Sequence, residues 1–199
     1  MAQPYSQARN FTYSWRILDI VTATVIGVFC GLIFWVWNNI GMIWYEAFQA
    51  LTPGLGGCAV GIWFLGGTLG AAIIRKPGAA LYVEILAAVI SAAFGNIWGL
   101  TTIISGFCQG LGMEIIVALF LYRRCGAIVL MLGAMMSGVI EWGYEFITGN
   151  HEKTNAFNVI YLISMSISGA ILAGLLAWVL TRMLRRTGVL NSFPSGMVA

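Results

Sequence analysis

Long apolar segments alternate with short polar connections along the whole chain. Six of these segments come close to the roughly 20 residues that a helix needs to cross a hydrocarbon core of about 30 Å. They cover residues 17–37, 57–74, 79–98, 103–122, 127–147 and 159–180. The pattern therefore predicts an all-α integral membrane protein, a bundle of six transmembrane helices.

The positions of lysine and arginine support this count and orient the bundle. Nine of the ten basic residues fall before the first segment or after the second, fourth and sixth. Only Lys153, between the fifth and sixth segments, falls on the other side. Because cytoplasmic loops carry an excess of Lys and Arg, we predict that the N-terminus and the C-terminus are both cytoplasmic.

The connection between the first two segments has its own apolar pattern. In residues 38–52, apolar side chains recur at helical spacing, from Ile40 through Trp44 and Phe48 to Leu51. We interpret this stretch as a short amphipathic helix at the outer surface. It would be either an interfacial anchor or a lid over a pocket that faces outward.

Composition limits the class of protein. Of the 199 residues, 60% are hydrophobic and 9% are charged, against about 25% charged in a soluble domain. The length suits one membrane-embedded domain, residues 1–199, with the lipid bilayer as a partner. The net charge of +3 comes from basic residues at helix ends, so no nucleic-acid partner is expected. The four cysteines are widely spaced, and neither a metal nor a cofactor is expected.

Four glutamates lie inside the predicted spans: Glu84, Glu114, Glu141 and Glu145. A carboxylate at the centre of a bilayer costs about 2.5 to 3.5 kcal/mol on insertion scales, and none of the four has a basic residue at similar depth. They either hold helices together by hydrogen bonds or await a cation from outside. Because Glu141 and Glu145 are four residues apart, they share one helix face.

Amide and aromatic side chains gather toward the same outer end. The amides are Asn96 and Gln109, and the rings include Trp37, Trp98 and Trp142, with Tyr45, Tyr144 and Tyr161 near them. About half of the rings fit an aromatic belt at the headgroups. The rest, beside carboxylates, would suit a flat organic cation or an aminopyrimidine, which rings can stack on and carboxylates can hydrogen-bond.

Small residues recur at a spacing of four in the first span: Ala23, Gly27 and Gly31. Such a face lets two helices approach closely. It could pack inside the bundle or dock onto another membrane subunit.

With these residues in view, the chain resembles the YkoE family, the substrate-binding S components of energy-coupling-factor (ECF) transporters for thiamine or its hydroxymethylpyrimidine (HMP) precursor. The resemblance is most specific in RKPGAALYVEILAAV (75–89), FGNIWGL (94–100) and QGLGMEIIVALFLYRR (109–124). It implies a non-enzymatic, multi-pass subunit of the bacterial cell membrane. Such a subunit captures its vitamin near the outer face and depends on a coupling transmembrane subunit and two ATPase subunits.

The resemblance also implies that Ala23, Gly27 and Gly31 form the docking face, with glycines where the family has alanines. Thiamine, with a thiazolium charge and an aminopyrimidine, suits the acids and rings named above. Other functional classes stay open. In a self-sufficient, proton-coupled secondary transporter of an organic cation, Glu84 or Glu114 would relay protons. A structural membrane protein is a weaker alternative, and an intramembrane enzyme lacks a nucleophile and base that can be placed.

Overall fold

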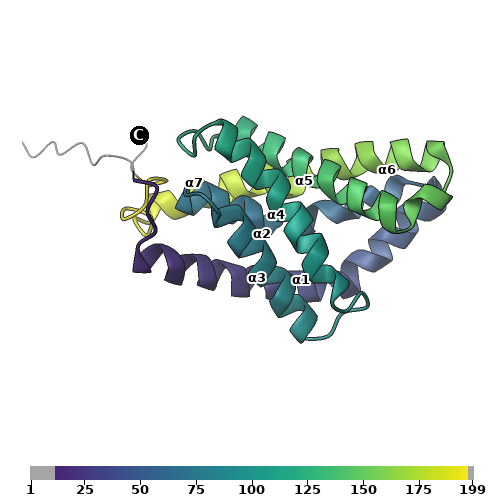
Figure 1. Cartoon of the computed structure of the whole chain (residues 1–199), viewed down its shortest axis with the longest axis horizontal. Helices are drawn as coiled ribbons and strands as arrows, with labels where there is room; N and C mark the ends of the chain where they lie inside the picture. Colours follow the sequence, from purple (N-terminus) through teal and green to yellow (C-terminus); the bar gives the residue numbers. More distant parts are fainter. Residues whose placement is uncertain (1–11, 197–199) are drawn as a thin grey trace, which may run out of the picture.

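The protein is a bundle of helices, seen in a computed structural model that describes residues 12–196 (Figure 1). The elements are α1 (Ile17–Leu51), the 3₁₀ helix η1 (Leu55–Phe64), α2 (Leu65–Ile74), α3 (Ala79–Ala93), α4 (Thr101–Leu119), α5 (Ala127–Thr148), the short 3₁₀ turn η2 (Asn150–Glu152), α6 (Asn155–Ser168), the π-helix η3 (Gly169–Leu175) and α7 (Leu176–Arg186). No strand occurs in these residues. The all-α prediction is therefore confirmed.

Five helical stretches are long and apolar enough to cross a membrane. They are Ile17–Leu51, Leu55–Ile74, Thr101–Leu119, Ala127–Thr148 and Asn155–Arg186. The third predicted span is shorter than expected, because α3 ends at Ala93 after 15 residues. Gly95 and Gly99 then adopt left-handed backbone conformations, which end the helix. At 1.5 Å per residue, α3 is about 22 Å long.

The predicted surface helix over residues 38–52 is not a separate element. These residues continue α1, which runs for 35 residues until Thr52 caps it just before Pro53. Figure 1 shows the helix turning upward in this second part. At the start of this part, the buried side chain of Asn38 hydrogen-bonds Ser91 Oγ at 2.9 Å, which holds α1 against α3.

The small residues of α1 lie inside the bundle, against α3. A Cβ at Gly27 would lie 2.8 Å from Leu86 Cδ2, and one at Gly31 would lie 2.6 Å from Ile90 Cβ. Ala23 is fully buried in a cluster with Ile74. Because α3 covers this face, Ala23, Gly27 and Gly31 are not exposed in this structure for the docking role predicted for them.

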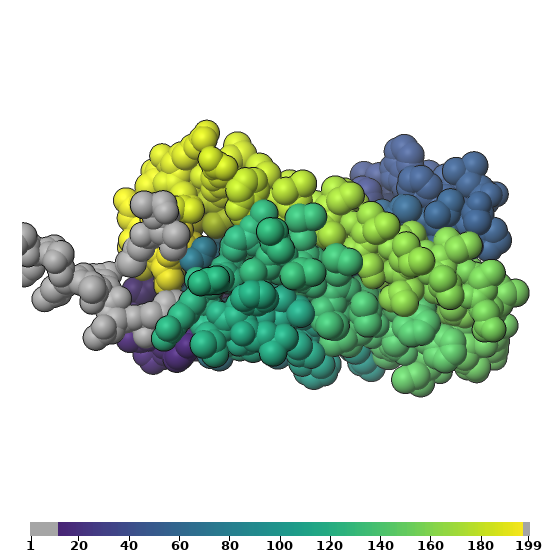
Figure 2. All heavy atoms as spheres, turned by 90° about the horizontal axis from the view of Figure 1, so that it is seen from above, coloured from purple at the N-terminus to yellow at the C-terminus, as the bar shows by residue number. Residues whose placement is uncertain are grey.

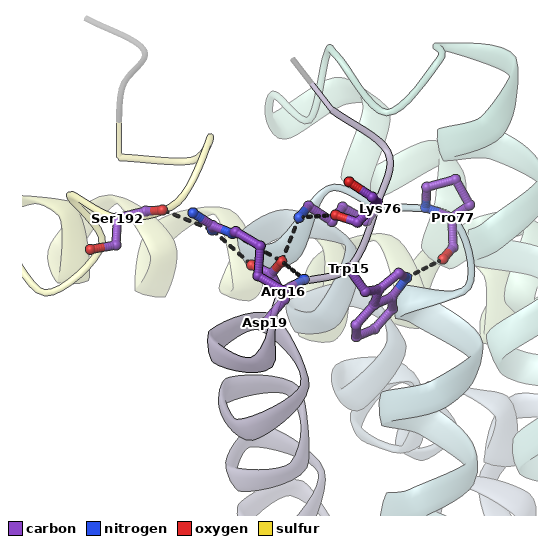
Figure 3. Close-up of polar contacts among 7 residues, drawn as sticks. Trp15, Arg16, Asp19, Lys76, Pro77 and Ser192 are labelled. Carbon is purple, nitrogen blue, oxygen red and sulfur yellow. Dashed lines mark hydrogen bonds and ion pairs between the residues drawn. The ribbon is translucent and has the colours of Figure 1, made fainter. Parts of the chain in front are cut away.

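The two ends of the described chain meet at one end of the bundle (Figures 1 and 3). Asp19, fully buried at the start of α1, pairs with Lys76 and, at 2.8 Å, with Arg16 Nη2. The same Nη2 donates to the Ser192 carbonyl at 2.9 Å. Phe193 packs beneath this segment, so the C-terminal residues close over the ends of α1 and α2.

Candidate functional site

A cavity of about 460 Å³ lies among α1, η1, α3, α4, α5 and α6. This volume falls within the roughly 300 to 1,000 Å³ of small-molecule sites. Its aromatic walls are Tyr45, Trp63, Trp98, Tyr144 and Tyr161, and its polar groups include Asn38, Ser91, Ser105, Gln109, Glu141 and Glu145. No group of three or more His, Cys, Asp or Glu side chains suited to a metal ion occurs among residues 12–196.

Glu141 supplies the least satisfied polar group of the cavity. Its side chain, on α5, is only 2% exposed, and Oε1 accepts a hydrogen bond from Ser105 Oγ. Its other oxygen, Oε2, is buried and accepts no hydrogen bond from any described residue. Because an unpaired buried carboxylate oxygen costs free energy, it marks the place where a donor or cation from outside would be stabilised.

Glu145 lies one turn further along α5 and lines the same cavity. Tyr161 Oη donates to its Oε1 at 3.3 Å, and Asn150 Nδ2 lies 3.4 Å from its Oε2. Two carboxylates this close cannot both stay ionised at low dielectric without a cation between or beside them. The pair is therefore suited to a cationic guest.

A hydrogen bond connects the wall of the cavity that is formed by Trp63 and Trp98 to α1. Trp63 Nε1 donates to Asn38 Oδ1 at 2.8 Å, which fixes the indole. The Trp63 ring meets Trp98 edge to face, with centroids 5.4 Å apart. These two rings, from η1 and from the turn after α3, present aromatic surface to the cavity.

Gln109 and Glu84 form a support behind that wall. With its side-chain amide turned so that the NH₂ group faces acceptors, Gln109 donates to the Trp63 carbonyl at 3.0 Å and to Glu84 Oε1 at 3.3 Å. Glu84 is 1% exposed and accepts the Gly67 backbone N–H through Oε2. Glu84 therefore reaches the cavity through Gln109, whereas Gln109 itself lines it.

Four of the nine predicted site residues line the cavity: Trp98, Gln109, Glu141 and Glu145. Trp37 and Trp142 do not, because their indole N–H groups tie elements together, to the Ala59 carbonyl at 2.9 Å and the Asn158 carbonyl at 3.1 Å. Asn96 stabilises the turn after α3 through Thr102 at 2.9 Å. These three residues stabilise the elements around the cavity and do not line it.

Glu114, which was predicted to belong to the site, lies outside this cavity. Its carboxylate accepts backbone N–H groups at the start of α3, from Gly78 at 2.6 Å and Ala80 at 3.1 Å. Tyr122 Oη adds a hydrogen bond at 2.9 Å. A carboxylate at the N-terminus of a helix is stabilised there by the helix dipole, so its role is structural.

Several lining residues were not among the predicted site. Asn38 and Trp63 were missed because the sequence pattern treats the end of α1 as a surface helix and η1 as an ordinary apolar span. Ser105 carries no signal of its own. Tyr45, Tyr144 and Tyr161 belonged to the aromatic group at the outer end, and only the fold separates them from belt residues.

Known proteins resemble this chain over most of its length. Residues 18–140 match the family described as ABC-type cobalt transport system, permease component. The chain is 35% identical over 186 residues to YkoE of Bacillus subtilis (strain 168), a candidate HMP/thiamine permease protein, covering 92% of this chain and 91% of that one. A crystal structure of an S-component of an ECF transporter superposes with a TM-score of 0.83 at 33% identity, covering 90% of each chain.

Proposed function

This chain belongs to the YkoE family of ECF-transporter S components, and on that premise we propose that its cavity binds thiamine or HMP for import. It is a transport component and not an enzyme. In this role it acts with a coupling transmembrane subunit and two ATPase subunits in a bacterial cell membrane. The small residues of α1 are not available for that assembly, so another surface makes the contact.

The observation that carries this proposal is the unpaired Glu141 Oε2 on the wall of an aromatic cavity. An aminopyrimidine offers amino hydrogens to a carboxylate, and thiamine adds a thiazolium charge. Trp63 and Trp98 offer ring surfaces, for which a cation–π contact contributes about 0.5 to 2 kcal/mol. Glu145, one turn away, adds the second negative group that a cation would stabilise.

Titration calorimetry of the full chain in detergent, with thiamine and with HMP in separate titrations, tests the proposal. We expect Glu141→Gln to weaken binding by about 10- to 100-fold, because a hydrogen bond to a charged group contributes about 1.5 to 3 kcal/mol. Glu152→Gln, an exposed acid in the loop before α6, is the control and should bind as the wild type does.

A comparison of the two ligands also shows which chemical group Glu141 binds. If both titrations weaken equally, the carboxylate binds the aminopyrimidine that the ligands share. If only thiamine weakens, it faces the thiazolium. Wild-type affinity of Glu141→Gln for both ligands, or no binding of either ligand to the wild type, would refute the proposed site.

A further inference from the structure

A second cavity, of about 810 Å³, lies at the end of the bundle where the two chain ends meet. It is lined by the end of α2, the turn after α4, the start of α5 and the last turns of α7. Figure 2 shows the C-terminal part of the described chain, in yellow, and the segment after α4, in teal, at this same end of the molecule. Six arginines line the cavity: Arg75, Arg123, Arg124, Arg182, Arg185 and Arg186.

No acidic side chain neutralises this group of arginines. The chain has seven Asp and Glu residues, and all of them lie within residues 12–196. The ion pairs within that range both belong to Asp19, with Arg16 and with Lys76. None of the seven acids lines the cavity. Six guanidinium groups thus share one cavity with no ionic partner from these acids.

Two buried groups in this cavity indicate that it is built for a ligand. Arg75 is only 7% exposed, and its one hydrogen bond among the described residues runs from Nε to the Ala72 carbonyl at 3.3 Å. Burial is the main cause that lowers the pKa of Arg75, while the nearby Cys125 raises it and Arg185 lowers it. Thr181, 6% exposed, has a buried hydroxyl with no partner in the described chain. A buried guanidinium group and a buried hydroxyl group normally have hydrogen-bond partners.

We propose that this cavity binds the phosphate headgroup of an anionic phospholipid. Guanidinium groups bind phosphate oxygens through paired hydrogen bonds, and the Thr181 hydroxyl can add another. The cavity lies at the ends of α2 and α7, where lipid phosphates are found, and basic pockets between transmembrane helices bind such headgroups. Trp178 in its wall supplies apolar contact for the lipid below its phosphate.

Native mass spectrometry of the full chain in detergent, with added phosphatidylglycerol, cardiolipin or phosphatidylcholine, tests this proposal. We expect the two anionic lipids to bind at least tenfold more tightly than the neutral one. Arg185→Gln should weaken the anionic lipids by about tenfold. Thr181→Val leaves the charge unchanged and should also weaken them. Lys153→Gln, which removes one charge in the loop before α6, should leave them unaffected.

Soluble phosphates distinguish the source of the ligand. Inorganic phosphate and glycerol phosphate should compete only weakly, because they lack apolar contacts. Competition by either at concentrations similar to those of the lipid would overturn the lipid assignment in favour of a free phosphate compound. Equal binding of phosphatidylcholine, or wild-type lipid binding by both Arg185→Gln and Thr181→Val, would overturn the site itself. If the arginines instead hold an acidic surface of a partner subunit, Arg185→Gln and Thr181→Val should both bind lipid as the wild type does, while uptake in cells is lost. That outcome would also overturn the lipid site. Because the readout is lipid binding, the outcome does not depend on thiamine or HMP.

Discussion

At the scale of single residues, the four intramembrane glutamates have three different uses. Glu141 and Glu145 line the cavity, Glu84 supports Gln109 behind it, and Glu114 caps α3. The sequence shows only that each acid lies within an apolar helix, which is the same signal for all four. What separates them is the partner that the fold supplies, above all the backbone N–H groups at the start of α3, which have no acceptor within the helix. A proton relay through Glu114 is disfavoured for the same reason.

Replacing Glu114 by Gln should affect stability more than ligand binding. The amide keeps the shape but loses the charge that the helix N-terminus stabilises, so we expect the free energy of unfolding to fall by about 1 to 2 kcal/mol. Unfolding by SDS in mixed micelles measures this change, and calorimetry with thiamine should give wild-type affinity. Glu141→Gln is the matched variant, in which affinity falls instead. A loss of affinity in Glu114→Gln without a loss of stability would return Glu114 to the site.

Some residues of the site could be predicted, because the sequence alone indicates the helix on which they lie and the face of that helix. Glu141 and Glu145 share a face of α5 by their spacing alone, and Gln109 is a rare amide in an apolar span. Asn38 and Trp63 could not be found in this way, because their role depends on α1 continuing past the membrane-length segment. In the continued helix, Asn38 forms tertiary hydrogen bonds with Ser91 and Trp63, which the sequence pattern does not show.

At the scale of elements, close packing of α1 against α3 replaces the expected docking face. A Cβ at Gly31 would lie 2.8 Å from the Ala87 carbonyl oxygen, which is backbone and cannot move aside easily. Small residues four positions apart predict a close helix contact, but they do not say which helix is the partner. The boundary of α3 was also misplaced, because the apolar pattern continues through Ile97 while the glycines end the helix.

Gly31→Ala should lower the free energy of unfolding by about 1 to 3 kcal/mol, as overpacking in a tight contact does. Gly143→Ala in α5 is the control, because an added Cβ there meets no atom within 4 Å. SDS unfolding of both variants measures the difference. Normal stability of Gly31→Ala together with loss of uptake in cells would revive the docking interpretation.

At the scale of the whole molecule, one buried ionic cluster connects both ends of the chain. Asp19 is 0% exposed and the Lys76 side chain 2%, and the Arg16 that pairs with Asp19 also binds the C-terminal segment (Figure 3). Removing one member of a buried pair leaves the other charge without a partner. The cluster therefore links the start of α1, the turn after α2 and residues near Ser192.

Asp19→Asn should destabilise the protein by about 3 to 5 kcal/mol, because Lys76 then stays buried without its counter-charge. Adding Lys76→Met should recover a large part of this loss. Arg16→Gln should cost less, about 0 to 1 kcal/mol, since that side chain is 41% exposed. Unfolding measurements on the single and double variants test the pairing. Additive losses in the double variant would show that Asp19 and Lys76 act independently.

The orientation in the membrane stays a prediction from the nine basic residues on one side. A fluorescent protein fused after Ala199 should mature in the cytoplasm. A cysteine in place of Lys153 should react with an impermeant reagent on intact cells. A dark fusion, with an active exported phosphatase at the same position, would reverse the orientation or change the number of crossings.

Because α3 is short, the thickness of the surrounding lipid bears on the conformation of this protein. A helix of about 22 Å is shorter than a hydrocarbon layer of about 30 Å, and local thinning of the lipid is one way to match it, at a cost of fractions of a kcal/mol per Å. The turn that follows carries exposed apolar side chains at Phe94, Ile97 and Leu100, and it holds Trp98 on the cavity wall. Where the lipid thins around α3, elastic strain acts on the same turn that shapes the cavity. We expect lipid chain length to tune ligand affinity, with short-chain lipids relaxing that strain and long-chain lipids pulling on the turn.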